Sequence, residues 1–156
     1  MSRPVAELVR ATGEWSVAID RCILAYGDRF LRRKSITCQN GLTFLVDLEK
    51  TTSLNAGDAF ELTDGRFIEV VAADEPLYHV TGPHLVRLAW HIGNRHTPCQ
   101  IETDHLLIQR DKVIGHMLEH LGATLDEVVR PFTPEGGAYG HGRTHSHEHG
   151  ATAQAH

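Results

Sequence analysis

The amino-acid sequence predicts an α+β protein with three parts: an all-β domain at residues 1–73, a ferredoxin-like domain with the element order βαββαβ at 74–134, and a disordered histidine-rich tail at 135–156. Three observations lead to this prediction. Short strand-like runs fill the first half of the chain. Two amphipathic helical segments follow among further short strands, and glycine and histidine dominate the end.

The first domain is predicted from runs rich in β-branched and aromatic residues, which favour strands. Turn residues that tolerate a positive φ separate these runs, as at Asn40-Gly41. A local concentration of positive charge is interpreted as a solvated strand face: Arg29, Arg32, Arg33 and Lys34. The expected strands include residues 17–19, 22–26, 42–48 and 67–71.

The second domain is expected to begin near Pro76, where the hydrophobic pattern changes to a helical period. Its first strand should lie within 71–80. A helix should follow Pro83, which suits a first helical position. The apolar stripe of this helix comprises Leu85, Leu88, Ala89 and Ile92. A short β pair is expected at 100–101 and 106–108.

A second helix is expected to begin near Asp111, a suitable N-cap, and to stop at Gly122. A last strand around 128–129 completes the βαββαβ order. From Pro134 onward the chain has hardly any apolar side chains to offset the entropy of ordering, so the tail is predicted to be disordered. One face of the second helix should carry Val113, Ile114, Met117, Leu118 and Leu121.

Composition and charge exclude several classes of protein. The 156-residue chain has no apolar run of the roughly 20 residues that a bilayer requires, and its start lacks the apolar core of a signal peptide. A net charge of -5 gives no general attraction for nucleic-acid phosphates. The three cysteines, Cys22, Cys38 and Cys99, fit free thiols in a reducing compartment. We therefore expect a cytoplasmic protein that binds neither membranes nor nucleic acid.

Histidine is unusually frequent, with 12 residues against 15 lysines and arginines together. Neutral imidazole is a common ligand for borderline metal ions. The tail could be merely solubilising, but histidine-rich tracts usually indicate metal binding. Four tail imidazoles can converge on one ion without a preformed pocket: His141, His145, His147 and His149. Such a site would lose its ion as imidazoles protonate below about pH 6.5.

His96 lies four residues after Ile92, which would place it on the apolar stripe of the first helix. A lone imidazole in that position is ordinarily a hydrogen-bonded core residue. If the stripe instead packs against its own copy across a two-fold axis, two His96 side chains meet and form half of a coordination shell. His91, Cys99 and His105 lie nearby in the sequence. Whether any of them contributes is left open, and structural roles are favoured for Cys99 and His105.

Two other functions compete with metal binding at His96. The segment His116-Met-Leu-Glu119-His120 matches H-x-x-E-H, in which two histidines hold zinc and glutamate acts as general base in a peptidase. A catalytic zinc also needs a third ligand and a cleft, and little chain remains after His120 to build them. A protein-interaction module with incidental histidines is the other alternative.

Several segments resemble the UreE family of urease accessory proteins: His91-Ile-Gly-Asn-Arg-His96-Thr-Pro, Asp111-Lys-Val-Ile and Pro131-Phe-Thr-Pro-Glu135 before a histidine-rich end. Asn55-Ala-Gly-Asp58 and the stretch from Asp64 also match the first domain of that family. The resemblance implies a homodimer with a β-domain for partner contact and no enzymatic activity. It also implies that His96 and its symmetry mate hold Ni²⁺ as cargo for a GTPase-containing complex that loads apo-urease.

One segment departs from some members of this family, which carry further metal-binding histidines just before the second helix. Here that segment reads Arg110-Asp111-Lys112, and its two cations cannot ligate a metal at neutral pH. We therefore expect no auxiliary site at this segment. Zn²⁺ and Cu²⁺ should compete with nickel, because affinity alone does not exclude them from imidazole sites.

Overall fold

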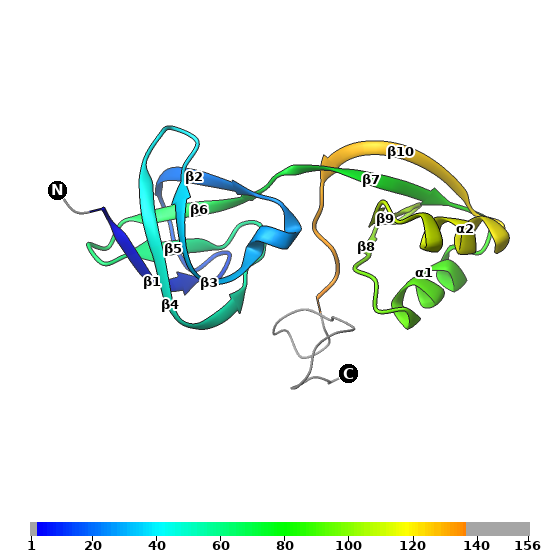
Figure 1. The fold of residues 1–156 in the computed structure, drawn as a ribbon, viewed down its shortest axis with the longest axis horizontal. Coiled ribbons are helices and arrows are strands. Elements are labelled where there is room, and N and C mark those ends of the chain that lie inside the picture. Colours follow the sequence, from blue (N-terminus) through cyan, green and yellow to red (C-terminus); the bar gives the residue numbers. More distant parts are fainter. Residues whose placement is uncertain (1–2, 137–156) are drawn as a thin grey trace. The chain divides into compact units, whose positions relative to one another are not determined.

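The computed structural model describes residues 3–136 and contains two compact units, one ending at Ala73 and the other beginning at Asp74 (Figure 1). The first unit is built mainly from strands, and the second combines short strands with two α-helices. This composition agrees with the α+β class. The predicted tail site, with His141, His145, His147 and His149, lies outside the described residues.

Six strands form one sheet in the first unit, in the order β2-β6-β5-β1-β4-β3. The pairs β1–β4 and β2–β6 are parallel, and the other neighbours are antiparallel. The runs at 17–19 and 22–26 contribute to a single strand, and Tyr26 begins a 3-10 helix, η1 (Tyr26–Arg29). The strands are β1 (Val5–Arg10), β2 (Ala18–Leu24), β3 (Phe30–Thr37), β4 (Thr43–Ser53), β5 (Ala59–Leu62) and β6 (Phe67–Ala72).

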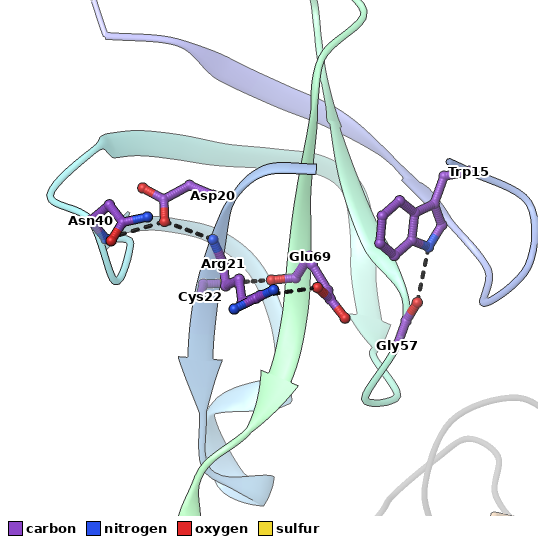
Figure 2. A network of polar contacts seen from close by, with 7 residues as sticks. All are labelled: Trp15, Asp20, Arg21, Cys22, Asn40, Gly57 and Glu69. Carbon is purple, nitrogen blue, oxygen red and sulfur yellow. Dashed lines mark hydrogen bonds and ion pairs between the residues drawn. The ribbon is translucent and has the colours of Figure 1, made fainter. Parts of the chain in front are cut away.

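A turn and a buried carboxylate connect the two outermost strands of this sheet. The amide of Gln39, just after β3, donates to the carbonyl of Arg21 in β2 at 2.8 Å. The carboxylate of Asp20, which is 7% exposed, accepts from the backbone amides of Arg21 and Asn40 at 2.8 and 3.1 Å (Figure 2). These bonds satisfy part of the β2 edge and so protect it from pairing with another chain.

The core of the first unit is filled by side chains that alternate along the strands. Residues 43–48 of β4 alternate between half-buried and buried, as expected for a strand with one face on the core. Phe44 of β4 and Phe60 of β5 are fully buried and meet edge to face, with ring centroids 5.4 Å apart. The apolar runs of the first half therefore form one shared core.

The basic cluster in this unit is only partly the solvated face that the sequence predicts. Arg32, Arg33 and Lys34 of β3 are exposed and lie 3.6 to 3.9 Å from carboxylates. Arg29 is 2% exposed, so the prediction is wrong for this residue. Because Arg29 ends η1 and precedes β3, it does not share the alternation of the strand.

The second unit has the element order strand, helix, strand, strand, helix, strand, which agrees with the predicted order. Its four strands form an antiparallel sheet in the order β10-β7-β9-β8. Neither helix is long and apolar enough to cross a membrane, and the same holds for every described helix. The elements are β7 (Asp74–Thr81), α1 (Leu85–Asn94), β8 (Gln100–Ile101), β9 (Leu106–Gln109), α2 (Lys112–His120) and β10 (Thr124–Pro131).

Both helices pack on the same face of this sheet (Figure 1). On α2, Ile114 and Leu118 are buried in the core, but Val113 is 66% exposed and Leu121 is 40% exposed. The predicted apolar face of α2 was thus too wide. Val113 lies about 100° round the helix from Ile114 and so points away from the core, and Leu121 lies beyond the last residue of the helix. The buried side chains of this core are Val80, Leu88, Ile92, Cys99, Leu106, Ile108, Ile114 and Leu118.

Candidate metal centre

The position of His96 depends on how α1 packs. Leu88 and Ile92, one turn apart, are 2% and 0% exposed and belong to the core of the second unit. Leu85 and Ala89 are partly buried against the same core. The stripe therefore packs on the sheet of its own chain, so the condition that it packs against a second copy is not met.

α1 ends in a turn that places His96 in the left-handed region. The amide of His96 donates to the carbonyl of Gly93 at 2.9 Å, and the amide of Thr97 donates to the carbonyl of Ile92 at 3.3 Å. With Arg95 as C-cap, these two bonds form a Schellman motif. The φ of His96 is 58°, which makes it the one non-glycine residue with a positive φ in the described part of the chain.

The end of α2 has the same motif with a glycine in the equivalent position. The amide of Gly122 donates to Glu119 at 3.0 Å, the amide of Ala123 donates to Leu118 at 2.9 Å, and the φ of Gly122 is 94°. Glycine adopts this conformation without steric cost, whereas an L-residue loses roughly 1–2 kcal/mol. The turn itself therefore gives no reason for a histidine at position 96.

The turn also moves His96 off the apolar stripe. The helix ends at Asn94, and the His96 side chain is exposed, so the prediction that it continues the stripe after Ile92 is wrong. The sequence carries a signal for this turn, because Pro98 disfavours helical backbone at Thr97 and prolines often follow a helix C-cap closely. A residue fixed by its backbone and exposed at its ring suits ligand binding.

At this position, a single chain supplies one metal ligand, the His96 imidazole. Within residues 3–136, no group of three or more histidine, cysteine, aspartate or glutamate side chains is placed to hold a metal ion. A single imidazole does not complete the shell of a transition-metal ion, which needs at least four donors. The remaining ligands must come from another chain, from residues outside the described part, or from water.

An apolar patch lies on the outward face of α1. Val86 is 85% exposed and Trp90, one turn further, is 63% exposed. The Trp90 ring meets the half-buried His91 ring edge to face, with centroids 5.1 Å apart. Exposed apolar side chains that lie together mark interaction surfaces. Val86 and Trp90 are called the α1 patch below.

Cys99 and His105 lie in structural positions. Cys99 is 9% exposed, and burial raises the pKa of its thiol to about 12, so it is protonated and a poor ligand at neutral pH. His105 lies in the turn between β8 and β9, as predicted, with its Nδ1 2.7 Å from the Asp104 carboxylate. That hydrogen bond lowers the pKa of Asp104. The His105 ring also stacks on His79, with centroids 4.2 Å apart.

The residues of the H-x-x-E-H segment are exposed on α2. His116, Glu119 and His120 all lie on the solvent side of the helix. No third potential ligand lies near enough to complete a metal site with them in the described residues. A zinc peptidase needs its metal inside a cleft that encloses a peptide. This arrangement gives no support to the peptidase alternative.

A second surface feature lies on the first unit, beside the start of β2. It is a pocket of about 420 Å³. The Trp15 indole in its wall donates to a backbone carbonyl at 2.9 Å, and Arg21 forms an ion pair with Glu69 at 3.3 Å (Figure 2). Val17 and Ile19, which also line the pocket, are 73% and 43% exposed. This mixture of apolar and polar groups suits contact with another protein.

Comparison with known proteins covers both units. Family models described as the N-terminal and C-terminal domains of UreE urease accessory protein match residues 5–73 and 75–156. The chain is 66% identical over 149 residues to the urease accessory protein UreE of Ruegeria pomeroyi, across 96% of this chain and 100% of that protein. It is 57% identical over 148 residues to that of Cereibacter sphaeroides, across 94% and 81%. It is also 54% identical over 145 residues to that of Rhodobacter capsulatus, across 93% and 92%.

Proposed function

Because this chain belongs to the UreE family of urease accessory proteins, we propose that it is a nickel metallochaperone that binds Ni²⁺ at a homodimer interface and delivers it to the urease maturation complex. It is an accessory protein and not an enzyme. The nickel ion is cargo, so the chain has to bind it and also release it.

The observation that carries the nickel proposal is the conformation of His96. An L-residue in the left-handed position of a Schellman motif is less stable than glycine, and the equivalent position in α2 is glycine. Backbone strain of this kind is concentrated at functional sites. We assign the function of His96 to its exposed imidazole, which is a good ligand for Ni²⁺.

The dimer supplies a second ligand of the same kind. In a two-fold dimer each residue near the axis meets its own copy, so two His96 imidazoles can bind one ion. The α1 patch supports this arrangement, because Val86 and Trp90 lie on the helix that precedes the His96 turn and remain exposed in a single chain. Covering this patch with the partner's copy would remove apolar surface from water.

We assign the remaining parts as follows. Residues 1–73 contact partners, and the pocket beside Trp15 is part of that surface. Residues 74–134 form a ferredoxin-like domain for metal binding and dimerisation. In the tail at 135–156, the imidazoles of His141, His145, His147 and His149 collect nickel and complete its coordination. The partners are the urease accessory GTPase and apo-urease, in the cytoplasm.

The ligand chemistry suits a carrier. Imidazole nitrogens hold Ni²⁺ with moderate strength, whereas thiolates would hold it longer, and all three thiols are buried with raised pKa values. Zn²⁺ and Cu²⁺ compete for the same nitrogens. Selectivity then depends on the geometry of the paired site.

Equilibrium dialysis against Ni²⁺ tests this assignment with three full-length variants. His96→Ala should lose the tightest site, and replacement of the four tail histidines by glutamine should reduce the number of ions bound. His84→Ala is the matched control, because His84 is an exposed histidine before α1 that is assigned no ligand role. If His96→Ala and the tail variant both bind nickel as the parent does, the assignment is wrong. A chain that binds no nickel at micromolar concentration would favour the interaction-module alternative.

A further inference from the structure

The histidine pair on α2 has a geometry that the proposed carrier mechanism does not use. We propose that His116 and His120 form a second metal site within each chain, for borderline divalent ions such as Zn²⁺, Ni²⁺ and Cu²⁺. The site requires neither a dimer nor the tail. It is therefore independent of the nickel site at His96.

The backbone of α2 holds the two residues in register. The Asp111 carboxylate accepts from the amide of Ile114 at 3.0 Å and caps the first turn, and the Gly122 turn fixes the last one. His116 and His120 are four residues apart, so their Cβ atoms lie roughly 5–6 Å apart on one face of the helix. Imidazole nitrogens bind these ions at about 2.0–2.1 Å, and two side chains at this spacing can reach a common ion.

Packing keeps this face of α2 open to solvent. Ile114 and Leu118 are 6% and 0% exposed. They lie on the opposite side of the helix and pack into the core on the sheet. His116 and His120 are both exposed, so an ion can reach them without any change in the core. The bound ion would carry water in its other positions and exchange readily.

The charges near the two histidines differ. Those near His120 attract a bound cation, and those near His116 repel it. The last turn of a helix carries partial negative charge on its carbonyls, and the Glu119 carboxylate lies beside His120 in the sequence. Lys112, one turn before His116, is exposed and opposes a cation. Replacing Lys112 by glutamine should therefore tighten the site.

A second pair of neighbouring histidines in this unit cannot chelate in the same way. His79 and His105 are stacked with an interplanar angle of 20° and centroids 4.2 Å apart. An imidazole binds a metal through a lone pair in the plane of its ring, and two nearly parallel planes do not converge on one nearby ion. His116 and His120 are instead exposed and four residues apart on one helix, the spacing at which two imidazoles bind one ion in the H-x-x-E-H pattern.

Hydrogen–deuterium exchange of the α2 amides in the full chain tests this site, with free Zn²⁺ held at a buffered concentration. An ion bound across one helical turn suppresses opening of that turn, by about 100-fold when free zinc is 100 times its dissociation constant. The parent should show this protection, and both His116→Ala and His120→Ala should lose it. His84→Ala should behave as the parent.

Two outcomes would overturn the proposal: zinc fails to slow exchange in α2 of the parent, or the single alanine variants stay as well protected as the parent. Dialysis of the same variants against Ni²⁺ separates this site from the carrier site. His116→Ala and His120→Ala should each remove an ion bound per chain and leave the His96-dependent ion in place. If they remove the His96-dependent ion instead, the two histidines belong to that site and not to a second one.

Discussion

His96 adopts a backbone conformation that most L-residues avoid, at the end of a helix that would accept glycine there. The cysteines show the opposite situation at the same scale, because Cys22, Cys38 and Cys99 are buried and serve the core. Exposure and strain, not residue type, separate the candidate ligand from the residues that only pack.

Replacing His96 by glycine should stabilise the metal-free fold. Glycine relieves roughly 1–2 kcal/mol of left-handed strain and loses part of this through the greater entropy of its unfolded chain, so a net gain of about 0.5–1 kcal/mol is expected. Urea unfolding of the apo protein measures the change. His96→Ala is the control, because alanine keeps the strain. A glycine variant less stable than the parent would show that the imidazole itself stabilises the turn.

The thiols should be unreactive in the folded chain. Burial raises the pKa values of Cys22, Cys38 and Cys99 to about 12, 11 and 12, from 9.0, so the protonated form dominates at neutral pH. Alkylation at about pH 8 should be slow in buffer and fast in denaturant. Rapid stoichiometric alkylation of the native chain would contradict the burial of these groups.

The same pKa values give the sign of a pH effect on stability. Because the folded-state values are raised, the stabilisation from protonated thiols is complete below the unfolded value of 9.0 and is lost as the pH rises toward 11 and 12. Urea unfolding midpoints should fall over this alkaline range. A Cys22→Ala variant should show a smaller fall than the parent, even if its midpoint is lower throughout.

At the scale of elements, the two helices of the second unit show what a sequence reveals. The start and end of α2 were predicted correctly, because Asp111 and Gly122 are strong cap signals. The end of α1 was misjudged, because the residue in the left-handed position is His96 and not glycine. Periodicity identified the apolar face of α1 but left open whether its own chain or another copy covers it, and the core of the second unit shows that its own chain does.

The α1 patch should control dimerisation. The double variant Val86→Ser, Trp90→Ser removes two exposed apolar side chains. It should raise the dimer dissociation constant by about 10-fold to 100-fold, as expected for an interface with an aromatic anchor. Circular dichroism should remain unchanged, because neither side chain contributes to the core. Analytical ultracentrifugation measures the dimer constant.

The matched control for this surface is Val113→Ser on α2. Val113 is 66% exposed, similar to the 63% of Trp90, but it lies on a helix that is assigned no dimer contact. This variant should dimerise as the parent does. Dissociation of the Val113 variant while the α1 variant stays dimeric would move the interface to α2.

For the molecule as a whole, the α+β class and the strand and helix order of the second unit could be predicted, because they follow from local patterns. Strands β1 and β5 of the first unit were not among the predicted runs. The buried position of Arg29 could not be predicted, because it ends a 3-10 helix that was not expected. The exposed position of Val113 could not be predicted, because the width of the buried face depends on how α2 packs on the sheet. The exposure of His96 also follows from a turn and not from the apolar pattern before it. A paired site is a property of two chains, so one sequence supplies only half of it.

In the proposed dimer, two His96 residues, one from each protomer, hold one nickel ion. Native mass spectrometry of mixed dimers tests this pairing, using His96 and His96→Gly chains that all carry His116→Ala and have the four tail histidines replaced by glutamine. With these changes neither the α2 pair nor the tail binds nickel. The masses separate dimers with two, one or no His96 residues in one sample. We predict that nickel remains only on dimers with two. Equal retention by dimers with one His96, or nickel bound to dissociated monomers, would contradict the claim.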